Sequence, residues 1–240
     1  MTERPSFITN EIVCNTKLAM KKDQYFIIPD AYSEIFCDKI RKQIDSIHEG
    51  SGVELNYDAT EMRIWSAQKR SPEINQFFID SNDLITRVSG RHNQAGFVLA
   101  IRNTALKMYN KLNLKNRWHI DSWRSQVKVF LWLSNTTEES GPFEFIPNTH
   151  KLSFRLRKAC EPGFFFDMKT IFKKNVNRPY QSISDEKIQL LFDQGYKTHP
   201  VLVSAGTVMV VNSSYLIHRA RPCRRGSRYA LTTYFDVPEN

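Results

Sequence analysis

The stretch "RWHIDSW", residues 117–123, holds a histidine and a carboxylate two positions apart, just before the apolar run "QVKVFLWLS" at residues 126–134. Residues two apart on an extended strand point to the same face, so His119 and Asp121 would present their side chains together. The pair can be a chance occurrence, a surface ion pair, or two of the three ligands of a metal site. The remaining sequence has to distinguish these three cases.

The run that follows alternates in the manner of a strand with two different faces. One face is apolar and predicts core: Val127, Val129, Leu131 and Leu133. The other face mixes polar and aromatic side chains: Gln126, Lys128, Phe130 and Trp132. This mixture is typical of a strand that lines a wet cavity, so the run predicts a strand between a core and a cavity.

The whole chain, residues 1–240, predicts a single, mainly β domain with flanking helices, arranged as a helix-buttressed barrel or jelly roll. Helices are expected at residues 33–50, capped by Ser33, and at residues 184–195. Strands are expected at residues 24–30, 95–106 and 126–134, within 141–151, and in short β-rich runs over 199–214 and 227–237 that Ala205-Gly206 and Gly226 interrupt. Three segments are harder to place: a polar leader at 1–22, helices and loops at 51–94, and an excursion at 153–200 that is expected to cover a pocket.

Composition favours a globular protein, because 41% of the residues are hydrophobic and 12% are aromatic. The four cysteines are scattered, as in reduced cytosolic proteins rather than disulfide or zinc scaffolds. The first residues are too polar for a signal peptide, and no apolar run approaches membrane-spanning length. We therefore expect a cytoplasmic protein without a membrane partner. Its oligomeric state is not predicted.

The formal net charge is +9, with the densest basic group in "HRARPCRRGSR" at residues 218–228. Such a group can attract nucleic acid, phosphate or carboxylate ligands, or an acidic partner. A solvated loop explains most of these arginines equally well. Arg228 differs, because it begins an alternating strand with Ala230, Thr232 and Tyr234 on its side.

A third metal ligand has to come from a distant strand. His218 follows a β-rich run late in the chain and is the best-placed histidine. The others are less suitable because they lie at a helix end, in a loop or turn, or before a proline: His48, His92, His150 and His199. Two histidines and one carboxylate form the facial triad of ferrous oxygenases, which leaves the opposite positions open. A buried guanidinium such as that of Arg228 is costly unless it holds a carboxylate, and a co-substrate could supply one.

In these features the sequence resembles the phytanoyl-CoA dioxygenase family of iron(II)/2-oxoglutarate oxygenases. The similarity runs through the opening strand and helix, through "WHIDS", through "QVKVFLWLSNTTEESGPFEFIPNTHK", and through "AGTVMVVNSSYLIH" followed by "SRYALTTYF". It covers about residues 23–236 in the family's order. The resemblance implies a double-stranded β-helix (jelly roll, cupin-like) core that binds Fe(II), 2-oxoglutarate and O2.

Carried over residue by residue, the resemblance implies that His119, Asp121 and His218 bind iron and that Arg228 holds the distal carboxylate of 2-oxoglutarate. It also implies lesser contributions to the co-substrate pocket from Gln126, Lys128, Phe130, Trp132, Arg102 and Asn103. Two departures are visible. "RARP" follows the late histidine in place of small residues, which alters the pocket rim. Asn148 replaces a turn glycine, whose left-handed conformation asparagine tolerates.

The implied reaction is hydroxylation of an unactivated C–H bond, with succinate and CO2 as co-products. Asp121 argues against halogenase chemistry, in which a small residue replaces the acid, whereas desaturation or ring chemistry stays open. The expected substrate is a small metabolite, a natural-product or sugar-type intermediate that is anionic or carrier-linked. Cations and aromatics that could meet it at the pocket mouth are Arg63, Trp65, Arg155, Arg157 and Phe164, Phe165, Phe166. Alternatives are a catalytically silent binding module and a nucleic-acid demethylase; Tyr234 replaces the second arginine of the latter.

Overall fold

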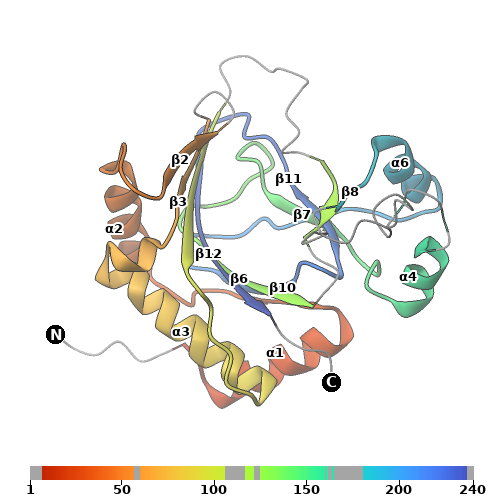
Figure 1. Ribbon diagram of the computed structural model, residues 1–240, viewed down its shortest axis with the longest axis horizontal. Helices are drawn as coiled ribbons and strands as arrows, with labels where there is room; N and C mark the ends of the chain where they lie inside the picture. Colours follow the sequence, from red (N-terminus) through yellow and green to blue (C-terminus); the bar gives the residue numbers. More distant parts are fainter. Residues whose placement is uncertain are drawn as a thin grey trace, which may run out of the picture.

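The computed structural model describes residues 7–56, 60–105, 117–121, 125–159, 161, 164 and 181–236. Two antiparallel sheets face each other, with helices on the outer side of each (Figure 1). The α-helices are α1 (Asn10–Lys22), α2 (Glu34–Asp45), α3 (Pro72–Ser89), α4 (Leu152–Ala159) and α6 (Asp185–Asp193), with one 3-10 turn, η1 (Ala67–Lys69). The architecture is the predicted jelly roll with flanking helices.

The larger, seven-stranded sheet has the order β1-β10-β6-β12-β4-β3-β2. Its strands are β1 (Tyr25–Ile28), β2 (Val53–Asn56), β3 (Glu61–Ile64), β4 (Val98–Thr104), β6 (Gln126–Trp132), β10 (Val208–Asn212) and β12 (Ser227–Asp236). The smaller sheet has the order β8-β5-β11-β7-β9. Its strands are β5 (His119–Ile120), β7 (Phe143–Ile146), β8 (Gln181–Ser182), β9 (His199–Pro200) and β11 (Ile217–Ala220). Strands far apart in sequence thus become neighbours, which brings residue 218 beside residue 119.

The period-two pattern of β6 explains how the larger sheet has two different faces. Val127, Val129 and Leu131 are buried with Ile40 of α2 and Phe77 of α3 in the largest apolar cluster. The opposite face looks toward the smaller sheet, where Trp132 belongs to a second cluster. The prediction that one face of this run is core is confirmed, because α1, α2 and α3 cover it (Figure 1).

The smaller sheet is covered on its outer side by α4 and α6 (Figure 1). Phe154 of α4 and Leu191 of α6 pack with Ile146 and Ile217 in a third apolar cluster. Phe164 lies in the same cluster, whereas Phe165 and Phe166 fall outside the described residues. No described residue from the 153–200 excursion lines the cavity beside His119, so its pocket-covering role stays a prediction.

The structure departs from the sequence-based elements at four places. The polar leader contains α1, whose Thr9 caps the helix by accepting from the Ile12 amide. Residues 51–94 contribute β2 and β3 to the sheet edge as well as α3. The helix capped by Ser33 ends at Asp45, before the expected Gly50. The excursion at 153–200 contains most of α4. Four basic or polar residues interrupt the few apolar residues of this helix, so its sequence shows no clear helical pattern.

Two further expectations can be checked directly. Asn148 has a φ of 68°, the left-handed conformation expected where the family has a turn glycine. Among the described residues, none of the helices is long and apolar enough to cross a membrane.

Candidate metal centre and cavity

The three predicted metal ligands meet between the two sheets. His119 on β5 and His218 on β11 are direct partners in the antiparallel register, and Asp121 follows β5. One ligand atom from each of the three residues lies within 4.8 Å of the others. The structure thus brings together two imidazole nitrogens and one carboxylate, the donor set that suits ferrous iron.

Both imidazoles are oriented in the same way by the backbone. The His119 Nδ1 lies 2.8 Å from the Arg117 carbonyl oxygen, and the His218 Nδ1 lies 2.9 Å from the Leu216 carbonyl oxygen. Because a carbonyl can only accept, each Nδ1 carries the proton and donates it. Each Nε2 faces Asp121, at 3.5 Å from its Oδ1 for His119 and 3.4 Å from its Oδ2 for His218. This backbone tether is the usual support of a metal-bound histidine.

The protonation states also suit a metal site. Burial lowers the pKa of His218 to about 4, despite the opposing charge of Asp121. Burial by itself would raise the pKa of Asp121, but the charge of the Lys128 ammonium leads the interactions that outweigh it and hold that pKa well below its usual value. At neutral pH His218 therefore offers a neutral imidazole and Asp121 an ionised carboxylate, so neither group has to lose a proton before a cation binds.

Lys128 reaches across the gap between the sheets to the metal centre. Its Nζ lies 2.5 Å from Asp121 Oδ2, and both side chains are largely buried. Burial would lower the pKa of Lys128, but Asp121 and then Tyr234 raise it above its usual value, so the ion pair is charged. In this structure the ammonium is the counter-charge of the ligand carboxylate.

The three ligands open into a cavity of about 400 Å³. Arg228 lines the same cavity from β12 and is 8% exposed. Its Nη1 is buried and has no hydrogen-bond partner among the residues that the structure describes, and the same holds for Trp65 Nε1 and Thr232 Oγ1. Buried polar atoms without partners are rare in folded proteins, so their concentration on one cavity indicates a polar ligand.

The structure separates the lesser candidates into two groups. Lys128, Phe130 and Trp132 line the cavity, as the alternation of β6 predicts. Gln126 lies at the start of β6 and does not line the cavity; its amide donates to Ser214 Oγ, and its carbonyl accepts from the Ser213 amide.

Arg102 was expected in the co-substrate pocket, and the structure places it elsewhere. Its Nη1 lies 2.9 Å from Asp45 Oδ1 on α2, on the helix-covered face of the larger sheet. The alternation along β4 is the reason, since Leu99 and Ile101 line the cavity while Arg102 has the opposite parity. Asn103 has the cavity-facing parity and is buried, but it does not reach the cavity lining.

Among the pocket-mouth candidates, Arg63 and Trp65 of the β3 region line the cavity, together with a residue that sequence reasoning missed, Glu61. Glu61 is 2% exposed, and its Oε1 lies 2.9 Å from Arg63 Nε. The alternation of "EMRIW" could have revealed this wall. Arg155 instead donates to the Ser214 carbonyl, and Arg157 donates to the Tyr196 hydroxyl, both away from the cavity.

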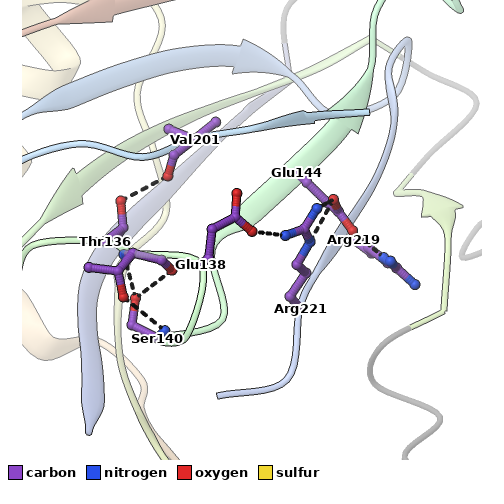
Figure 2. A network of polar contacts seen from close by, with 8 residues as sticks. Thr136, Glu138, Ser140, Glu144, Val201, Arg219 and Arg221 are labelled. Carbon is purple, nitrogen blue, oxygen red and sulfur yellow. Dashed lines mark hydrogen bonds and ion pairs between the residues drawn. The ribbon is translucent and has the colours of Figure 1, made fainter. Parts of the chain in front are cut away.

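The basic group at 218–228 is largely neutralised at its start. Figure 2 shows Arg219 and Arg221 converging on Glu144 of β7, with Arg221 also paired to Glu138. Glu144 is fully buried, so two guanidinium groups compensate one desolvated carboxylate. Gly141 makes the close approach possible, because at its φ of 73° a Cβ would lie 2.5 Å from the Arg221 carbonyl oxygen. Arg219 and Arg221 therefore have a structural role next to His218, in which they pair with the buried Glu144 carboxylate.

Comparison with known proteins gives a consistent result. The family model described as phytanoyl-CoA dioxygenase (PhyH) matches residues 20–228. No curated protein matches the chain in sequence. Similar solved structures include SnoN, an epimerase in complex with Fe3+, alpha ketoglutarate and nogalamycin RO, with a TM-score of 0.66 and 11% identity over 95% of this chain and 84% of SnoN.

Two further solved structures share the fold. SnoK, an alpha-ketoglutarate-dependent carbocyclase from nogalamycin biosynthesis, has a TM-score of 0.65 and 15% identity over 95% of this chain and 84% of its own. HygX from Streptomyces hygroscopicus, solved with nickel and 2-oxoglutarate, has a TM-score of 0.61 and 14% identity over 95% of this chain and 87% of its own. At these identities the likeness establishes the architecture.

Proposed function

The chain belongs to the phytanoyl-CoA dioxygenase family, and on that premise we propose that it is an iron(II)- and 2-oxoglutarate-dependent dioxygenase that hydroxylates a C–H bond of a small metabolite. The observation that carries this proposal is the pairing, on one cavity, of the His119–Asp121–His218 cluster with the Arg228 guanidinium. A group of three metal-binding side chains would by itself fit many functions. A buried cation whose Nη1 lacks a hydrogen-bond partner among the described residues adds a specific requirement for a carboxylate ligand.

The donor set fits iron(II). His119, Asp121 and His218 would hold the metal, and the backbone tethers at both Nδ1 atoms keep the imidazoles aimed at it. Bound iron, together with 2-oxoglutarate and O2, would supply the oxidation of an unactivated C–H bond, with succinate and CO2 as co-products. Asp121 would contribute one negative charge, which its low pKa maintains.

The remaining residues of the cavity would bind and orient the ligands. Arg228 would take the distal carboxylate of 2-oxoglutarate through its planar guanidinium, and the Thr232 hydroxyl on the same strand face could add a hydrogen bond. Phe130, Trp132 and Phe143 add aromatic surface to the lining of the cavity, which would help to exclude water from the bound ligands. Exclusion of water strengthens the charge interactions inside the cavity.

The substrate of the proposed reaction is a natural-product or sugar-type intermediate that is anionic or carrier-linked. The solved structures support this class only by analogy, since their names include nogalamycin RO and hygromycin B. On this chain, Arg63 is one-third exposed and lies with Trp65 on the cavity wall, where a cation and an indole N–H could meet an anionic or hydroxyl-rich group.

Hydroxylation is distinguished from other outcomes by product mass. A gain of one oxygen atom supports hydroxylation. A loss of two hydrogens indicates desaturation or ring closure, and an unchanged mass indicates epimerisation, the reaction named for SnoN.

The test of the proposal is anaerobic addition of iron(II) and then 2-oxoglutarate to metal-free protein. We expect the weak visible charge-transfer band of keto-acid chelation, absent in His119→Ala, and succinate release once O2 is admitted. If iron binds but no band forms, the oxygenase proposal fails and a catalytically silent binding module takes its place.

Replacing Lys128 gives a separate prediction about the metal-free protein. Lys128→Met leaves Asp121 buried without its cation, so the unfolding free energy should fall by about 3 kcal/mol. A divalent metal restores the missing charge, so nickel(II) should raise the melting temperature of the variant by more than it raises that of the wild type. Thermal denaturation with and without nickel(II) measures both effects.

Lys42→Met is the matched control, since Lys42 pairs with Asp38 at the surface and is 78% exposed. It should change stability by less than about 1 kcal/mol. A Lys128→Met protein as stable as the wild type without metal would show that the ammonium is not the counter-charge of Asp121.

A further inference from the structure

The two residues that adjoin the histidine ligands are joined by one guanidinium. Trp118 precedes His119, and Arg219 follows His218. The Arg219 Cζ lies 4.5 Å from the centroid of the Trp118 ring, within the range of a cation–π contact. Arg219 points away from the cavity, since it alternates with His218 along β11.

The same guanidinium also binds the strand on the other side of β11. Arg219 Nε lies 2.5 Å from Glu144 Oε1, and Glu144 on β7 is its direct partner in the antiparallel register (Figure 2). Because β11 lies between β5 and β7, Arg219 connects β11 to β7 on one side and to Trp118, the residue before β5, on the other. Strands β5 and β11 carry the two histidines.

The backbone by itself specifies this register weakly. Strand β5 has two residues, and its pairing with β11 consists of the single pair His119 and His218. A slip of one residue would turn every side chain of β5 to the other face of the sheet. Pairing with β8 and the bond from the Asp121 amide to the Ser213 carbonyl also hold β5. A buried carboxylate that requires specific partners adds a side-chain constraint between β11 and its neighbours.

We propose that Arg219 is a positioning residue for the metal centre, anchored by Trp118 on one side and by Glu144 on the other. This inference rests on the proposed metal site. It gives the beginning of the basic group at 218–228 a role in holding His119 and His218 at a common site, in place of a role in attracting nucleic acid or an acidic partner.

Arg221 provides a matched control. It contacts the second oxygen of the same carboxylate, with its Nε 2.7 Å from Glu144 Oε2, and it lies three residues from His218. Arg219→Gln and Arg221→Gln each remove one guanidinium from Glu144. Only Arg219→Gln also removes the cation that contacts Trp118.

The experiment measures nickel(II) affinity by calorimetry and stability by urea denaturation for both variants and for Trp118→Leu. We expect Arg219→Gln and Trp118→Leu to weaken nickel(II) binding by about tenfold or more, as for other residues that orient metal ligands. Arg221→Gln should stay within about threefold of the wild type at a similar loss of stability. Equal affinities in Arg219→Gln and Arg221→Gln would overturn the proposal, because the arginines would then act through stability alone.

A second readout does not depend on metal binding. In the metal-free protein, the imidazole nitrogen resonances of His119 and His218 should shift in Arg219→Gln and stay in place in Arg221→Gln. Unchanged resonances in Arg219→Gln would contradict the positioning role. If the wild type itself binds no metal, the proposed function fails, whereas these resonances still decide the role of Arg219.

Discussion

An Asp121→Ala variant is expected to bind divalent metal between about a hundredfold and several thousandfold more weakly than the wild type. The estimate follows from the cost of removing one member of a buried charged contact, about 3–5 kcal/mol, converted to a ratio of dissociation constants. Asp121 is the only carboxylate in the described ligand cluster, so its loss leaves two imidazoles beside the Lys128 ammonium. Turnover of 2-oxoglutarate should fall at least as far, because metal loading limits it.

Calorimetric titration with nickel(II) and succinate release with iron(II) measure the two quantities. Asp45→Ala is the matched control, because Asp45 is also an ion-paired aspartate but contacts Arg102 on the far face of the sheet. It should retain metal affinity. Full metal binding and turnover in Asp121→Ala would remove the proposed metal centre.

Arg228→Ala has the second-largest expected effect, on 2-oxoglutarate. Truncating one partner of a buried charge pair costs about 2–5 kcal/mol, which corresponds to a loss of affinity between about thirtyfold and several thousandfold. Arg228→Lys keeps the charge but loses the planar fork, so its affinity should lie between those of the wild type and Arg228→Ala. Metal affinity should change little in both variants, because Arg228 is not among the clustered ligands.

Titration of the metal-loaded protein with 2-oxoglutarate, followed by the visible band or by calorimetry, makes the measurement. The matched control is Arg102→Ala. Arg102 lies on the strand beside β12 but pairs with Asp45, so its removal should leave 2-oxoglutarate affinity unchanged. The co-substrate pocket would be misplaced if Arg228→Ala bound 2-oxoglutarate as tightly as the wild type, or if Arg102→Ala lost that affinity.

The sequence was most informative where two faces of an element differ in polarity. Along β6 the alternation separates Val127, Val129 and Leu131 from Lys128 and the aromatic residues, and the structure has the same division. The proximity of His119 and Asp121 was predictable because residues two apart on an extended strand point to the same face. The jelly roll itself followed from the order of several motifs along the chain, which no single pattern would have indicated.

Sequence reasoning failed where both faces of a strand are covered. Strand β4 packs against helices on one side and against the cavity on the other, so "VLAIRNT" carries no alternation from which the orientation of Arg102 could be deduced. The contact of Lys128 with Asp121 was also hidden, because it joins two sheets and depends on how far apart they lie. The segment before Lys22 lacked a strong apolar stripe, so α1 was not expected.

The division of the cavity between two sheets has a mechanical consequence. His119 and His218 of the proposed metal site lie in the smaller sheet and Arg228 lies in the larger one, so a 2-oxoglutarate molecule held at both ends would link the two sheets. Amide protons of β11 and β12 should then exchange with deuterium more slowly, and to a similar extent, when metal and co-substrate are both present. Metal alone would slow amide exchange in β11 and leave exchange in β12 unchanged. The rigidity of the protein would then depend on bound 2-oxoglutarate, which the proposed reaction consumes.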